Sequence, residues 1–240
     1  MKNKKITSKN IIIILFIIIL VLILSSFTYL LTGNYKAEED VLNYLNSTEI
    51  VNVSKVKEGY FFDGPGESTA IIFYPGAKVD YRAYSRLMYK IAENGKDCFL
   101  IKMPFNIAIL GADKADKIID KYNYENYYIS GHSLGGVVAC NYAKKNSEKI
   151  KAVICLAAYS SVRIPSRIKY ISIYGSEDKV LNKEKYDEAK KFLNDEAKEF
   201  VIEGGNHSGF ANYGEQKKDG KSQITKEEQQ NYVVKVLSDL

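Results

Sequence analysis

The stretch NYYISGHSLGGVVACNY, residues 126–142, contains the pattern that decides the fold. Residues 127–129 are β-formers and predict a strand, whereas residues 137–140 predict the first turns of a buried helix. Between them lies GHSLG, residues 131–135, a G-x-S-x-G pentapeptide. In a nucleophile elbow of this pattern, the serine sits on a tight strand-to-helix turn and the glycines allow close packing. Because a strand and a helix flank the motif, it predicts Ser133 as a nucleophile; the alternative is a glycine-rich turn with an incidental serine.

The composition of the 240-residue chain suits one domain plus an appendage. The net charge is +5, but four lysines precede a hydrophobic run near the N-terminus, and subtracting them leaves +1 for the rest: Lys2, Lys4, Lys5 and Lys9. The chain therefore shows no basic patch that would indicate a nucleic-acid partner. The three cysteines, Cys98, Cys140 and Cys155, fall in apolar stretches, and their odd number and spacing predict neither a disulfide framework nor a zinc site.

Residues 11–24 are apolar without a break, and the run resumes as far as Leu31 after interruption by Ser25, Ser26 and Thr28. A helix over residues 11–31 would be about 31 Å long, close to the thickness of a bilayer core. We expect a single-pass signal-anchor helix there, with a basic cytoplasmic tail over residues 1–10 and the catalytic domain outside the cytoplasm, at the cell membrane. A cleaved signal peptide is the alternative.

Residues 32–58 have little pattern and predict a spacer, so the domain is expected to span residues 59–240. Strands and helices alternate along it. Alternation of this kind predicts an α/β fold, a mainly parallel sheet with helices on both faces. The predicted strands are 60–62, 70–74, 98–103, 127–129, 152–158, 170–174 and 200–202, and the predicted helices are 81–92, 107–122, one from 137, 186–193 and one beginning at Thr225.

A serine hydroxyl needs a general base, which is most often histidine. The chain has two histidines, and His132 lies inside the turn itself, where its side chain leaves the strand on a different side. That leaves His207, just beyond the last predicted strand, at the carboxyl edge of the sheet where Ser133 also lies. The orienting acid should come between them in the chain, at a strand end, and we favour Asp178 over its neighbour Glu177.

An oxyanion hole on such a fold uses the N–H of the residue after the nucleophile, here Leu134. A second N–H comes from the loop that follows an earlier strand, which here is PGAK, residues 75–78. Ala77 is the expected donor and Lys78 the reserve, although an ordinary Pro-Gly turn is the alternative for this loop.

Five segments together resemble the α/β-hydrolase superfamily, near its small dienelactone-hydrolase-like branch: FYPGAKVDYRAY (73–84), IKMPFNIAIL (101–110), SGHSLGG (130–136), SIYGSEDKV (172–180) and IEGGNHSGFANYGEQ (202–216). The resemblance implies a serine-hydrolase fold with Ser133, Asp178 and His207 in the triad positions. Two features depart from relatives. Many esterases carry His-Gly-Gly-Gly in the oxyanion loop, where this chain has Pro-Gly-Ala. True dienelactone hydrolases use cysteine as the nucleophile, where this chain has Ser133, so dienelactone substrates are not implied.

About eleven residues separate the strand ending near Ala158 from the one starting at Tyr170, too few for a cap domain, so we expect an open, shallow site. The expected function is a membrane-anchored, esterase-like serine hydrolase that cleaves an acyl ester or related bond of a small molecule through an acyl-enzyme, with no metal or cofactor. A non-catalytic binding module on the same fold and an acyltransferase to a cell-envelope acceptor are the alternatives.

Overall fold

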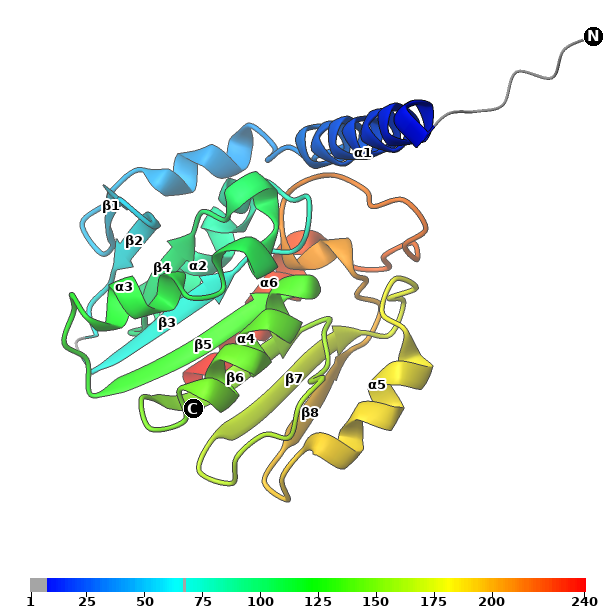
Figure 1. Cartoon of the computed structure of the whole chain (residues 1–240). Coiled ribbons are helices and arrows are strands. Elements are labelled where there is room, and N and C mark those ends of the chain that lie inside the picture. The colour runs from blue at the N-terminus through cyan, green and yellow to red at the C-terminus, as the bar shows by residue number, and fades with distance from the viewer. Residues whose placement is uncertain (1–7, 67) are drawn as a thin grey trace, which may run out of the picture. The chain divides into compact units, whose positions relative to one another are not determined.

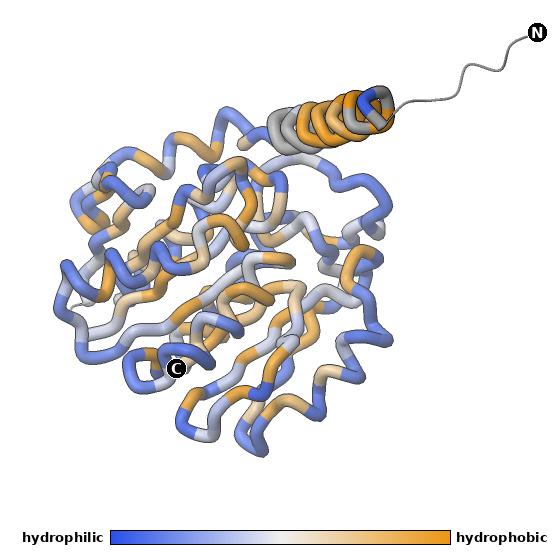
Figure 2. Tube along the Cα trace, in the orientation of Figure 1, coloured by the Kyte–Doolittle hydropathy of each residue, from blue (hydrophilic) through white to orange (hydrophobic). Residues whose placement is uncertain are grey.

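The structure, a computed structural model, describes residues 8–66 and 68–240 and divides into two compact units, Met1–Asn34 and Tyr35–Leu240. Most of the basic tail predicted for residues 1–10 lies outside the described residues. In the first unit, one helix, α1 (Ser8–Leu31), has a largely hydrophobic sequence (Figure 2). Its described large apolar side chains between Ile11 and Leu24 are 45% to 67% exposed.

The membrane span predicted over residues 11–31 finds no support in the structure. A helix is present there, but none in the described part of the chain is both long enough and apolar enough to cross a membrane. The unbroken apolar run of residues 11–24 would be only about 21 Å long as a helix, against roughly 30 Å for a bilayer core.

In the second unit, eight strands form one sheet in the order β1-β2-β4-β3-β5-β6-β7-β8 (Figure 1). The first two pairings, β1 with β2 and β2 with β4, are antiparallel, and all others are parallel. The mainly parallel sheet predicted from the sequence is therefore present. The strands are β1 (Asn52–Val56), β2 (Gly59–Asp63), β3 (Thr69–Tyr74), β4 (Asp97–Ile101), β5 (Asn126–His132), β6 (Ile150–Leu156), β7 (Lys169–Gly175) and β8 (Lys198–Ile202).

Helices cover both faces of this sheet (Figure 1). The α-helices of this unit are α2 (Ser85–Glu93), α3 (Lys114–Ile119), α4 (Leu134–Lys145), α5 (Lys183–Ala189) and α6 (Lys226–Ser238). Short 3-10 helices lie in the connections: η1 (Asp40–Leu45), η2 (Tyr81–Tyr84), η3 (Pro104–Asn106), η4 (Ala108–Gly111), η5 (Lys190–Phe192) and η6 (Ser208–Phe210). The helix predicted to begin at Thr225 is α6, and a capping box precedes it, with reciprocal bonds between Thr225 and Glu228.

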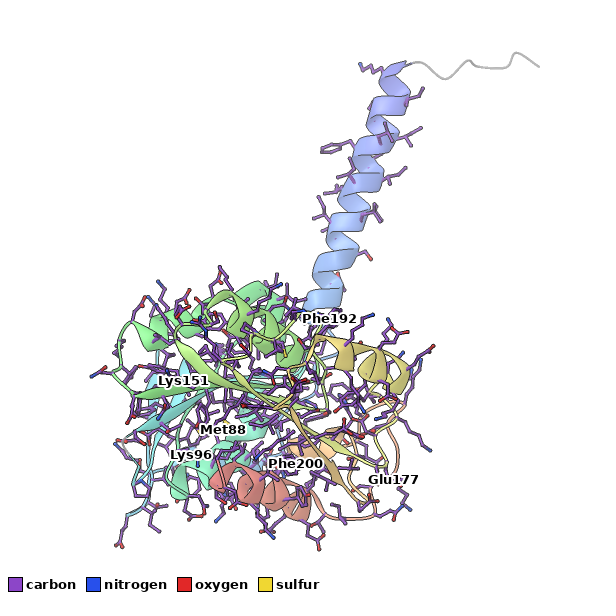
Figure 3. All side chains as sticks on the ribbon, turned by 90° about the horizontal axis from the view of Figure 1, so that it is seen from below. Met88, Lys96, Lys151, Glu177, Phe192 and Phe200 are labelled. Atoms are coloured by element: carbon purple, nitrogen blue, oxygen red, sulfur yellow. The ribbon has the colours of Figure 1, made fainter. Side chains whose placement is uncertain are left out.

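The side chains of β3 divide between two cores, one on each face of the sheet. Ile71 and Phe73 join α2 and α6 in one core, whereas Ile72 and Tyr74 join α3 and α4 in the other. Met88 of α2 is fully buried in the first core (Figure 3). This two-residue alternation in a strand buried on both faces is expected of a central strand in a parallel sheet.

Two segments differ from the prediction. Residues 32–58, expected as a spacer, contribute β1 to the sheet, and Val51 is fully buried in its core. Residues 107–122, expected as one helix, form η4 and the short α3 instead. Ile107 is extended (φ −123°, ψ 109°), and Asp113 (φ −89°, ψ 7°) leaves helical geometry between η4 and α3, so one continuous helix does not form.

Candidate active site

Ser133 occupies the turn between β5 and α4, as the sequence predicted. Its backbone has φ 53° and ψ −124°, a sparsely populated conformation for a residue with a Cβ. Its N–H donates to the Leu156 carbonyl at 2.9 Å, and its carbonyl accepts from the Gly136 N–H at 3.0 Å. These bonds hold a strained serine, partly exposed, between a central strand and the first turn of a helix.

The glycines of the elbow are required by close backbone contacts. A Cβ on Gly131 would lie 2.4 Å from the Gly135 carbonyl carbon. A Cβ on Gly135 would lie 2.1 Å from the Tyr74 carbonyl oxygen, and one on Gly136 would lie 2.5 Å from the Ala158 Cβ. The spacing of small residues in the motif therefore follows from the packing of α4 on the sheet.

We expect Gly135→Ala to lower the free energy of unfolding by about 3 kcal/mol or more, since the new methyl group meets the rigid backbone of β3. Gly214→Ala is the matched control. Gly214 has φ +86°, but nothing lies within 4 Å of the position that a Cβ would occupy there, so that change should cost only about 1–2 kcal/mol. Chemical denaturation of both variants measures the difference, and equal losses would contradict this packing explanation.

His207 and Asp178 form a buried pair. The Nδ1 atom of His207 lies 2.8 Å from Oδ2 of Asp178, and their side chains are only 2% and 1% exposed. The other ring nitrogen, Nε2 of His207, is one of two buried side-chain polar atoms in the described chain that have no hydrogen-bond partner. A buried polar atom without a partner is costly, so this nitrogen is the one available for a reaction partner.

Asp178, rather than Glu177, reaches the histidine. Oδ1 of Asp178 accepts from the N–H groups of Val180 and Leu181 at 2.9 and 2.8 Å, which fixes the carboxylate and leaves Oδ2 for the imidazole. The Glu177 carboxylate instead accepts from Gln223 on the exposed side of the turn. Of the two adjacent acids, the structure therefore brings Asp178, the one favoured from the sequence, to the histidine.

The loop that carries His207 is held by two polar side chains, the half-buried Asp219 and the buried Gln229. The Asp219 carboxylate accepts from the N–H groups of His207 and Ser208, at 3.2 and 2.8 Å. Gln229 of α6, fully buried, accepts from the Asn206 N–H at 3.0 Å and donates to its carbonyl at 2.7 Å. Sequence reasoning missed both residues, because nothing local to them indicates a loop more than ten residues away.

The N–H groups expected in the oxyanion hole belong to the first residue of α4 and to the loop after β3. Leu134 is the first residue of α4, where a helix leaves the N–H without an intrahelical partner. In the loop after β3, the Gly76 N–H donates to the Tyr84 hydroxyl and the Lys78 N–H donates to the Asn106 carbonyl. No described residue accepts from the Ala77 N–H. Ala77 is thus the donor left free, and the reserve donor Lys78 is engaged elsewhere.

Ser133, Leu134 and His207 line one cavity of about 230 Å³, together with Val137, Ala157, Ala158, Tyr159, Val180, Leu181 and Asn182. Ala157, like Ser133, has a positive φ, 48°. Hollows of about 450 and 500 Å³ occur elsewhere, but neither contains a nucleophile beside a base. The chemistry of the lining, rather than the volume, identifies the site.

No group of three or more His, Cys, Asp or Glu residues is arranged to hold a metal ion within residues 8–66 and 68–240. The cysteines lie away from the site cavity, and all three are buried. The reacting groups available are a serine hydroxyl, an imidazole with a carboxylate behind it, and free N–H groups at a helix N-terminus. That arrangement suits acyl transfer to a serine.

The chain belongs to the alpha/beta hydrolase family, whose sequence pattern it matches over residues 70–231. This match confirms the superfamily inferred from the five segments. No curated protein sequence matches the chain.

Solved structures show the same fold at low sequence identity. A dienelactone hydrolase from Anabaena variabilis is 14% identical, with a TM-score of 0.58 over 79% of this chain and 96% of the other. A predicted CIB-like hydrolase from Thermoplasma acidophilum is 14% identical, with a TM-score of 0.56 over 79% and 100%. An epoxide hydrolase from Vigna radiata is 13% identical, with a TM-score of 0.57 over 81% and 100%.

Proposed function

We propose that the protein is a serine hydrolase that cleaves small neutral acyl esters through an acyl-enzyme. The observation that carries this proposal is the unpartnered Nε2 of His207. This atom belongs to an imidazole held by Asp178 at 2.8 Å, and His207 lines the same cavity as the strained Ser133. A nucleophile, a base and an orienting acid together make the elbow chemically useful.

In the proposed reaction, the Ser133 oxygen attacks the ester carbonyl while Nε2 of His207 takes the hydroxyl proton. Asp178 stabilises the resulting imidazolium through Nδ1–H, and the N–H groups of Leu134 and Ala77 bind the oxyanion. The imidazolium then protonates the leaving alcohol as its C–O bond breaks. Water repeats the sequence on the acyl-enzyme, releasing the acid and restoring the serine.

The lining of the cavity supports a substrate with a short, uncharged acyl group. Its ten lining residues include no Lys, Arg, Asp or Glu, and its walls are mostly aliphatic. A charged acyl group would lose hydration there without gaining an ion partner. The volume of about 230 Å³ also leaves little wall for a long chain.

A panel of p-nitrophenyl esters tests this proposal. We expect the acetyl and butyryl esters to be hydrolysed with kcat/KM at least about 10-fold above the succinyl ester, the ratio that about 1.4 kcal/mol of lost transition-state binding gives. The palmitoyl ester should be poorer still. A preference for the succinyl or palmitoyl ester would contradict the proposed substrate class, and background rates for all four would favour a binding module. A rate that depends on an added alcohol acceptor would instead indicate acyl transfer.

The location inferred from the sequence, with the domain outside the cytoplasm, stays a prediction and is independent of this chemistry. Both sequence interpretations, an anchor and a cleaved signal peptide, place the domain on that side because of the basic N-terminal flank. Protease added to intact cells stripped of their wall is expected to degrade residues 35–240. A protected domain in intact cells, degraded only after lysis, would contradict this location.

A further inference from the structure

His132, the residue before the nucleophile, makes two buried hydrogen bonds that the proposed reaction does not use. Its Nδ1 lies 2.8 Å from the Tyr84 hydroxyl oxygen, and its Nε2 lies 3.0 Å from the carbonyl oxygen of His207. The side chain is 1% exposed. The Tyr84 hydroxyl in turn accepts from the Gly76 N–H at 3.1 Å. One imidazole therefore links the loop of Gly76 to the loop of His207.

The hydrogen-bond partners of His132 fix the protonation state of its ring. The His207 carbonyl can only accept a hydrogen bond, so Nε2 of His132 carries a proton and donates it there. The Tyr84 hydroxyl already accepts from the Gly76 N–H, and its own proton has an acceptor in Nδ1 of His132 only when that nitrogen is unprotonated. Only the neutral imidazole with its proton on Nε2 satisfies every partner. Burial and the nearby His207 lower the pKa of His132 well below its usual value, which agrees with this state.

We propose that His132 is a positioning residue that holds the oxyanion loop and the general base in register with Ser133, an inference that rests on the proposed function. The backbone of His132 leads directly into the nucleophile turn. Its Nε2–H fixes the backbone carbonyl of His207, and thereby the backbone position from which the His207 side chain extends. On its other side, a Cβ on Gly76 would lie only 2.9 Å from Nδ1, so the oxyanion loop packs on the imidazole itself.

The neutrality of His132 also serves the reaction. The ring centroids of His132 and His207 are 4.6 Å apart. In the proposed mechanism, His207 becomes positively charged in the transition state, and a second cation at this distance would oppose that charge. The Tyr84 hydroxyl, which itself donates to Nδ1, keeps a proton off that nitrogen.

Two amide substitutions separate the two bonds of His132. In His132→Gln, the amide nitrogen can take the place of Nε2 and donate to the His207 carbonyl, whereas in His132→Asn the shorter amide reaches only toward Tyr84. We expect His132→Asn to lower kcat on p-nitrophenyl acetate by about 100-fold, the cost of a misplaced catalytic group, with KM changed less than about 3-fold. His132→Gln should recover most of that loss. In wild-type protein, ¹⁵N NMR at pH 7 should show His132 neutral with its proton on Nε2.

Tyr84→Phe provides a second test if His132→Asn does not fold. It keeps the buried ring but removes the bond to Nδ1, and we expect a kcat about 10-fold below wild type at unchanged KM, the effect of about 1.4 kcal/mol. Thermal unfolding checks that each variant is folded. A wild-type kcat in folded His132→Asn or Tyr84→Phe, equal losses in the Asn and Gln variants, or a proton on Nδ1 would overturn the positioning role alone. Absence of turnover by the wild-type protein would overturn the proposed function together with it.

Discussion

Replacing Ser133 by alanine is expected to lower kcat for p-nitrophenyl acetate on the order of 10⁶-fold, the loss measured when a serine protease loses its nucleophile. The physical reason is that no covalent intermediate can form without the Oγ atom. Two other site residues, His207 and Leu134, still line the cavity, but His207 has no hydroxyl to deprotonate. Initial rates of the purified full chain, with the spontaneous hydrolysis rate subtracted, measure the effect.

Ser161→Ala is a suitable control for that change. The Ser161 hydroxyl accepts from the Asn141 amide at an exposed position and is not part of the cavity lining. Its removal should leave kcat within about 2-fold of wild type, since one exposed hydrogen bond contributes little. Turnover by folded Ser133→Ala at the wild-type rate would show that Ser133 is not the nucleophile.

Asp178→Asn should lower kcat by about 10⁴-fold, the size of the effect when a triad aspartate becomes asparagine. The amide cannot stabilise the His207 cation, and it favours the wrong tautomer when its NH₂ group faces Nδ1. Because the amide keeps the size of the carboxylate, the bonds from Val180 and Leu181 to Oδ1 can persist and the turn should stay folded.

Glu177→Gln is the matched control for Asp178→Asn, since it makes the same chemical change one residue earlier. The Glu177 side chain points to Gln223 rather than to His207, so its kcat should stay within about 2-fold of wild type. Steady-state kinetics on both variants decide between the two acids. Equal, small effects would remove Asp178 from the proposed mechanism, and a larger loss in Glu177→Gln would reverse the assignment.

The features that could be predicted from the sequence are those with a local signature. The elbow is one, because a tight strand-turn-helix requires glycine where a Cβ would lie only 2.1–2.5 Å from neighbouring atoms. The central strands are another, since β3 is buried at every position and its sequence is correspondingly apolar. Asp178 and His207 followed from their place at strand ends, which brings residues 29 apart within 2.8 Å.

The features that were missed depend on contacts between distant segments. β1 has partly exposed, mixed side chains at the antiparallel edge of the sheet, so its sequence carries little apolar pattern. Gln229 and Asp219 have no distinctive sequence pattern around them, and their role follows only from their hydrogen bonds to the loop of His207. The sequence argument set His132 aside as the base, but its partners, the Tyr84 hydroxyl and the His207 carbonyl, become visible only in three dimensions.

Covalent labelling with a fluorophosphonate probe tests the identity of the nucleophile most directly. Such probes react with a serine only when a base activates it and an oxyanion site accepts the phosphoryl oxygen. We expect one adduct per chain on the purified wild-type protein, mapped by peptide mass spectrometry to Ser133, and none on Ser133→Ala or His207→Ala. A folded wild-type protein that stays unlabelled, or that carries the adduct on another residue, would contradict the proposal that Ser133 is an activated nucleophile.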